Sequence, residues 1–141
     1  MIGLLFVSAV AGQVAPSVTQ RPQAVVIADV QSVRPVRAPP CTNSDTNICI
    51  LGVPDVGRAT IRRFLVGKGS TGRISFVAGA PVGLKTGRHA LLMDWSGGNW
   101  FVVGVSATAR PCFGSTLVDP ATAADPRFRR VGDDYCLILT R

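Results

Sequence analysis

The residues best suited to chemistry lie in one stretch, GRHALLMDWSGGNWFVVGV, residues 87–105. It contains His89, the only histidine of the chain, followed by Asp94 and both tryptophans. A histidine oriented by a carboxylate can act as a general base, so a minor hydrolase using His89 is one hypothesis for function. Side chains of a β-strand alternate between its two faces, so positions 89 and 94 point to opposite sides. We therefore expect a structural histidine in a hairpin rather than a catalytic pair.

The serines and the glycine-rich turn supply no further catalytic parts. No serine lies in G-x-S-x-G, the strained turn that exposes the nucleophile of many hydrolases. The segment GKGSTG (67–72) would need glycine at position 62 and serine or threonine at 69 to form a phosphate-binding loop, but the chain has Arg62 and Gly69 there. We interpret GKGSTG as a hairpin turn and predict a non-catalytic protein without a cofactor.

The cysteines form an even set with long gaps, namely Cys41, Cys49, Cys112 and Cys136. Structural zinc sites use closely spaced pairs with histidines nearby, so we expect no metal here. In a small exported domain, an even number of cysteines indicates disulfides. Of the three possible connectivities we favour Cys41–Cys49 with Cys112–Cys136, because each pair brackets a polar, turn-rich segment that a bridge would close.

The N-terminus indicates export. Residues 1–11, MIGLLFVSAVA, are apolar and end in Ala-Val-Ala, which fits the cleavage pattern of a signal peptide. We interpret residues 12–23 as a flexible N-terminal segment of the mature chain. No stretch approaches the roughly 20 apolar residues of a transmembrane helix. The sequence therefore predicts a periplasmic or secreted protein without a transmembrane segment.

Positive charge dominates the surface chemistry. The chain has 15 Lys and Arg residues against eight acidic residues, all of them aspartate, and a formal net charge of +7. Such a charge permits attraction to anionic polymers, although many basic faces are simply solvated. The densest basic cluster consists of Arg58, Arg62, Arg63, Lys68 and Arg73. We predict that this cluster, and the pair Trp95 and Trp100 beside the SGGN turn, contact a partner.

These side chains must be positioned by strands, because the composition disfavours helices. The chain contains no glutamate, 15 glycines and 10 prolines. The patterns of β-branched residues and turns predict strands at 24–33, 48–53, 58–66, 73–80, 89–95, 100–106 and 135–140, and a loop at 34–47. The apolar alternation of the third strand changes phase at Phe64, which predicts a β-bulge. The continuous run WFVVGV predicts a strand that is buried on both sides or lies at a barrel seam.

The predicted strands add up to one domain. We predict that residues 24–141 form an all-β domain, a small five- or six-stranded OB-like barrel with disulfides. The segment DPATAADPRF holds a short helical turn at most. No internal repeat and no amphipathic helical period interrupts this pattern.

The strand order resembles the netrin-like class of OB-fold modules, which includes the inhibitory domain of the tissue inhibitors of metalloproteinases and exported bacterial relatives of unassigned role. The resemblance covers residues 24–106 and rests on AVVIADVQSV, ATIRRFLVGKGSTGRISF with its Lys-Gly turn, and HALLMDWSGGNWFVV. Inhibitors of that class begin with Cys-x-Cys, whose terminal amine and carbonyl bind the protease zinc. Here Cys41 is internal and Cys49 is its nearest cysteine, so this inhibitory mechanism is not implied.

These observations favour an exported, non-catalytic binding or structural module of the cell envelope. Its expected partner is an envelope protein or an anionic polymer. An OB domain that binds nucleic acid is an alternative, but such domains combine cations with many aromatic rings, and aromatic residues make up only 6% of this chain. A hydrolase using His89 remains the hypothesis from another functional class.

Overall fold

The fold is given by a computed structural model that describes residues 22–36, 54–79 and 82–139. Several predicted features lie outside the described residues. They are the leader (1–11), almost all of the N-terminal segment (12–23), the strand at 48–53 and the Cys41–Cys49 bridge. The remaining elements can be compared directly with the sequence-based expectations.

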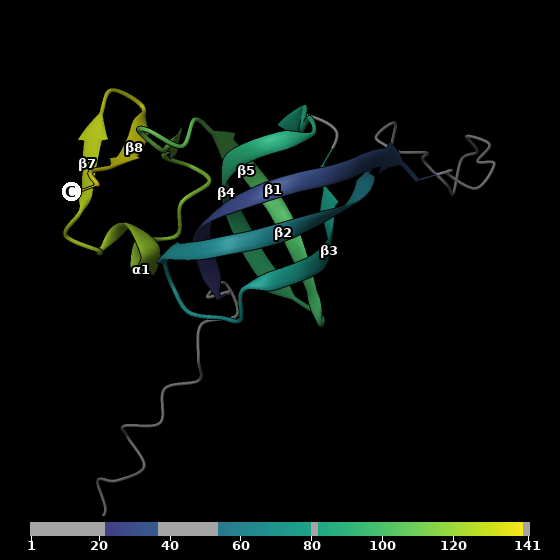
Figure 1. The fold of residues 1–141 in the computed structure, drawn as a ribbon. Coiled ribbons are helices and arrows are strands. Elements are labelled where there is room, and N and C mark those ends of the chain that lie inside the picture. The colour runs from purple at the N-terminus through teal and green to yellow at the C-terminus, as the bar shows by residue number, and fades with distance from the viewer. Residues whose placement is uncertain (1–21, 37–53, 80–81, 140–141) are drawn as a thin grey trace, which may run out of the picture.

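Five strands form a closed barrel (Figure 1). They are β1 (Gln23–Pro35), β2 (Asp55–Val66), β3 (Gly72–Ala78), β4 (Gly87–Ser96) and β5 (Asn99–Ser106). Their order is β1-β2-β3-β5-β4, with β4 pairing back onto β1. All neighbours are antiparallel except β3 and β5, which pair in parallel at the seam where the barrel closes. The predicted all-β, OB-like barrel is therefore confirmed.

Alternating apolar side chains fill the barrel. Along β1, the residues Ala24, Val26, Ala28 and Val30 belong to one buried cluster, as the two-residue period of a strand requires. The other strands contribute their own alternating residues, and Leu84 from the β3–β4 connection joins the same cluster. This interior is packed with side chains.

The phase change predicted near Phe64 is a bulge. Ala28 pairs with Ile61, whereas the preceding residue Ile27 pairs with Arg63, so Arg62 is the extra residue of β2. A second shift places an extra residue between Phe64 and Val66. Bulges of this kind increase local twist and bend a strand, which helps a short sheet to close.

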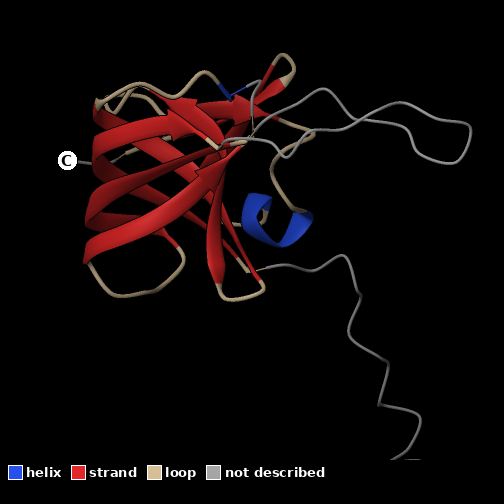
Figure 2. Ribbon diagram, turned by 90° about the vertical axis from the view of Figure 1, so that its right-hand side faces the viewer, coloured by secondary structure: helices blue, strands red, loops and turns tan. Residues whose placement is uncertain are grey.

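A C-terminal lobe follows the barrel (Figures 1 and 2). It contains β6 (Cys112–Gly114), α1 (Pro120–Ala123), β7 (Phe128–Val131) and β8 (Asp134–Leu137), with the sheet order β6-β8-β7. Cys112 and Cys136 lie directly opposite each other and form a disulfide. The predicted bridge and the predicted short helical turn are confirmed, while β6 and β7 were not expected.

The lobe covers one outer side of the barrel. A second buried cluster joins the barrel to the lobe. The barrel contributes the outward-facing residues Val25, Ile27, Leu65, Ala90 and Leu92, and the lobe contributes Phe113, Val118, Phe128 and Leu137. Two strands are therefore buried on both faces, β4 at Ala90, Leu91, Leu92 and Met93 and the first half of β1 at residues 24–28. The run WFVVGV lies in β5 at the barrel seam, one of the two positions predicted for it.

Candidate functional site

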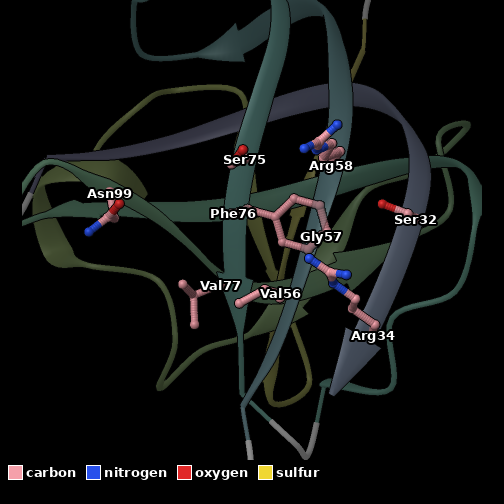
Figure 3. Close-up of a pocket in the computed structure, with 9 residues that line it drawn as sticks. All are labelled: Ser32, Arg34, Val56, Gly57, Arg58, Ser75, Phe76, Val77 and Asn99. Atoms are coloured by element: carbon pink, nitrogen blue, oxygen red, sulfur yellow. The ribbon is translucent and has the colours of Figure 1, made fainter. Parts of the chain in front are cut away.

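An open groove crosses the outer face of β1, β2 and β3. It consists of two adjoining hollows of about 570 and 600 Å³ that share Ser32, Arg58 and Ser75. Figure 3 shows the first hollow, in which the side chains of β1, β2 and β3 are joined by Asn99 at the start of β5. Arg34 lines the first hollow and Arg73 lines the second. The groove therefore runs between these two arginines and passes Arg58.

The strand register aligns the three arginines on a diagonal. Arg58 pairs with Ser32 on β1, and Arg34 lies two residues farther along β1. On the other side Arg58 pairs with Ser75, and Arg73 lies two residues back along β3. Two residues along a strand span about 6.7 Å and neighbouring strands are about 4.8 Å apart, so successive arginines are about 8 Å apart at their Cα atoms. We call Arg34, Arg58 and Arg73 the arginine diagonal.

The arginine diagonal has no carboxylate partner within the described residues, where all ion pairs involve other side chains. All three diagonal arginines are exposed. Like charges at this spacing repel one another weakly through water. An anion in the groove would remove that repulsion.

A neighbouring part of the same face behaves differently. Asp29 accepts hydrogen bonds from Nε of Arg88 at 2.7 Å and from Nε of Arg62 at 2.6 Å. These bonds, that from Arg88 first, hold the pKa of Asp29 far below its ordinary value. Asp29 thereby ties β1 to β2 and β4, and Arg62 is committed to an ion pair rather than to a ligand.

Neutral polar groups alternate with the cations of the groove. Ser32 and Ser75 face each other across Arg58, and Asn99 adds an amide at one end. The ring of Phe76 lies under the first hollow and is only 2% exposed (Figure 3). Gly57 permits this packing, because a Cβ at that position would collide with the Phe76 ring and the Ser32 carbonyl oxygen. Among the described residues the groove therefore offers cations, hydroxyls, an amide and the half-buried side chains of Val56 and Val77, but no exposed aromatic ring.

The predicted basic cluster is divided among several places. Arg58 and Arg73 line the groove, and Arg62 belongs to the Asp29 ion pairs. Arg63 is exposed opposite Ile27, and Lys68 lies in the turn between β2 and β3.

Other groove residues were missed by sequence reasoning. The three prolines and the polar turn residues of segment 34–47 predict a loop that includes Arg34, but β1 continues to Pro35, which occupies the last position of the strand. Ser32, Ser75 and Asn99 carry no sequence signal of their own. Strand alternation could have placed Ser75 on the face of Arg73, but only the register joins them to Arg34.

The two tryptophans form a pair at the end of the β4–β5 hairpin. Trp95 and Trp100 lie directly opposite each other, with ring centroids 5.0 Å apart in an edge-to-face arrangement. Trp100 packs against the barrel core, while Trp95 is 40% exposed. Gly97 and Gly98 have positive φ angles of 58° and 82°, which form the predicted tight turn. Neither tryptophan lines the groove.

His89 and Asp94 are held apart by β4. Nε2 of His89 lies 2.9 Å from the carbonyl oxygen of Lys85, and Asp94 accepts a hydrogen bond from the Gln23 amide at 2.7 Å. Leu91 and Leu92 belong to different clusters, so the alternation of faces between positions 89 and 94 is as predicted. Within ranges 22–36, 54–79 and 82–139, no three His, Cys, Asp or Glu side chains gather as a metal site would require.

The wider comparisons leave the site to be interpreted from its own geometry. In the described part of the chain, no helix has the length and apolar character needed to cross a membrane. The resemblance to netrin-like modules stays a prediction. No protein-family model, curated protein or solved structure matches this chain.

Proposed function

We propose that this protein is an exported, non-catalytic binding module that holds an anionic polymer in the groove on β1, β2 and β3. The observation that carries the proposal is the arginine diagonal, whose cations have no carboxylate partner among the described residues. Guanidinium groups bind carboxylates, sulfates and phosphates through paired hydrogen bonds, so a row of them suits a chain of repeating anions.

The position of the groove supports binding rather than catalysis. OB-type barrels bind elongated ligands on the outer face of their second and third strands, which is where Arg58 and Arg73 lie. The groove is open along its length, and His89 is not among its lining residues. A ligand in it would contact cations and hydroxyls without a general base beside it.

Export is part of the proposal. The Cys112–Cys136 disulfide supports it, because such bridges persist in oxidising compartments such as the periplasm or the extracellular space. The apolar leader predicted at residues 1–11 points the same way. The polymer would then be a component of the cell envelope or its surroundings.

Calorimetric titration with heparin, used as a generic polyanion, tests the proposal. We expect binding at low salt whose affinity falls steeply as salt rises, since each neutralised anion releases a counterion. Arg58→Gln should weaken binding about tenfold and lower the salt slope by about one, as expected for one lost contact. The matched control is Arg63→Gln, which removes the same charge from the same strand outside the groove.

The control decides between a site and a general charge effect. If Arg63→Gln weakened heparin binding as much as Arg58→Gln, net charge rather than the groove would account for the affinity. If the unaltered protein did not bind at low salt, the proposed function would be rejected.

A further inference from the structure

We propose that the polymer held in the groove is an acidic polysaccharide, bound as an extended chain along the arginine diagonal. This inference rests on the proposed function and specifies its ligand class. Arg34, Arg58 and Arg73 take acidic groups that recur along the chain, and Ser32 and Ser75 bind sugar hydroxyls between them.

The spacing of the cations is the first argument. Successive arginines of the diagonal are about 8 Å apart at their Cα atoms, from the rise along a strand and the distance between strands. A polyphosphate carries a charge on every unit, so several of its charges would fall between two neighbouring arginines. A polysaccharide that carries its acidic group on alternate sugars places its charges much farther apart, which matches one charge for each arginine.

The groups between the cations are the second argument. Ser32 and Ser75 lie on either side of Arg58, and neither hydroxyl makes a hydrogen bond to another described residue. Asn99 adds an amide whose one hydrogen bond, to the Gly97 carbonyl, is long at 3.5 Å. A hydroxyl-rich ligand can use these donors and acceptors, whereas a bare phosphate chain offers acceptors alone.

The absence of an accessible ring in the groove is the third argument. Proteins that bind single-stranded nucleic acid stack its bases on aromatic side chains. Among the described residues, Phe76 is the only aromatic one that lines the two hollows, and it is 2% exposed because it packs in the barrel core. The exposed ring of Trp95 lies outside the groove. Base stacking is therefore not available along the arginine diagonal.

A panel of four polymers tests the ligand class by calorimetric titration of the full-length protein. Hyaluronan and chondroitin, which carry a carboxylate on alternate sugars, represent acidic polysaccharides, polyphosphate represents a dense anion, and oligothymidylate represents nucleic acid. We expect one of the polysaccharides to bind at least about tenfold more tightly, per charge, than polyphosphate or oligothymidylate. Its affinity should also depend less on salt, because hydrogen bonds to hydroxyls release no counterions.

Serine variants separate hydroxyl recognition from charge. The double variant Ser32→Ala/Ser75→Ala should weaken polysaccharide binding about tenfold and polyphosphate binding less, since a sugar hydroxyl can both donate to a serine and accept from it whereas phosphate can only accept. Arg58→Gln should weaken both. The serines are exposed, so circular dichroism is expected to report an unchanged fold.

The possible outcomes distinguish this inference from the proposed function. Affinities that simply follow charge density, or serine variants that change nothing, would overturn the polysaccharide assignment and leave an anion-binding module. Tightest binding to oligothymidylate would replace the polysaccharide with nucleic acid. Absence of binding to all four polymers and to heparin would reject both proposals.

Discussion

The two halves of β1 present opposite surfaces although they belong to one continuous strand. The first outward-facing residues, Val25 and Ile27, are apolar and lie beneath the C-terminal lobe. The last ones, Ser32 and Arg34, are polar, exposed and line the groove. Between the halves stands Asp29, paired with two arginines. One barrel strand thus carries a surface that packs against the lobe and, after it, the surface of the proposed binding groove.

The arginines on the outer face of this barrel fall into two groups. Arg62 and Arg88 meet a carboxylate and hold strands together, whereas Arg58 lies nearby on the same face without one. The number of cations therefore does not identify a binding surface. In the proposed function, the arginines without a nearby carboxylate among the described residues form the binding surface.

The largest effect is expected where the lobe covers the barrel. Leu92→Ala would remove a completely buried side chain from the cluster between barrel and lobe. We expect a loss of about 4 kcal/mol in the free energy of unfolding, from lost burial and the cavity that remains. Urea denaturation measures it, with Ser75→Ala as the exposed control expected within about 0.5 kcal/mol of the unaltered protein. A small loss for Leu92→Ala would show that the lobe contributes little.

The C-terminal lobe is also held by the Cys112–Cys136 disulfide. Replacing both Cys112 and Cys136 by serine opens a loop whose ends are separated by 24 residues. We expect the free energy of unfolding to fall by about 3 kcal/mol, mainly because the unfolded chain gains conformational freedom. Thermal unfolding under identical conditions measures it. An unchanged midpoint would mean that packing alone keeps the lobe in place.

Substitutions in the exposed second half of β1 should change ligand binding rather than the stability of the protein. Arg34→Gln removes one cation of the arginine diagonal, so heparin affinity should fall about tenfold, or about 1.4 kcal/mol. Its free energy of unfolding should stay within about 0.5 kcal/mol, because the side chain is exposed and unpaired among the described residues. Lys68→Gln removes an equal charge from the β2–β3 turn and serves as the control. Equal losses for both variants would remove Arg34 from the site.

The ion pairs of Asp29 should make the stability of the protein depend on pH. Because the folded state lowers the pKa of Asp29, the unfolded chain takes up the proton more readily. Its stabilising effect is therefore complete at neutral pH, declines below about pH 4 and disappears only below the folded-state pKa. Asp29→Asn should be less stable at pH 7 and lose less stability between pH 5 and about pH 2 than the unaltered protein. Urea denaturation of both proteins at several pH values in this range measures the difference. If the free energy of unfolding depended on pH identically in both, the role assigned to Asp29 would be contradicted.

Much of the barrel follows from short-range sequence patterns. Alternation of apolar residues predicted β1 to β5 within a few residues at each end, and the phase change near Phe64 predicted a bulge. Gly97-Gly98 marked the hairpin, because this turn needs two residues with positive φ. The strands β6 and β7 are only three and four residues long, too short to establish a period.

The site was less predictable than the fold. Arg58 and Arg73 were expected as contact residues, but in the same cluster as Arg62, which the structure commits to Asp29. Asp29 is 33 residues from Arg62 and 59 from Arg88, so sequence distance gave no hint of that ion pair. Arg34 begins a segment whose three prolines and polar residues predict a loop, although the structure extends β1 through it.

The amino-acid sequence predicted the class of the fold and contained no familiar catalytic motif, because these depend on composition, local periodicity and residue type. It only favoured the Cys112–Cys136 bridge among three possible connectivities, and the structure shows that this bridge is formed. The tertiary structure alone decided which arginines share a groove and which are neutralised. Strand register makes that choice, since it sets which residues of β1, β2 and β3 lie side by side. Register in turn reflects the packing of the whole barrel, which no single segment specifies.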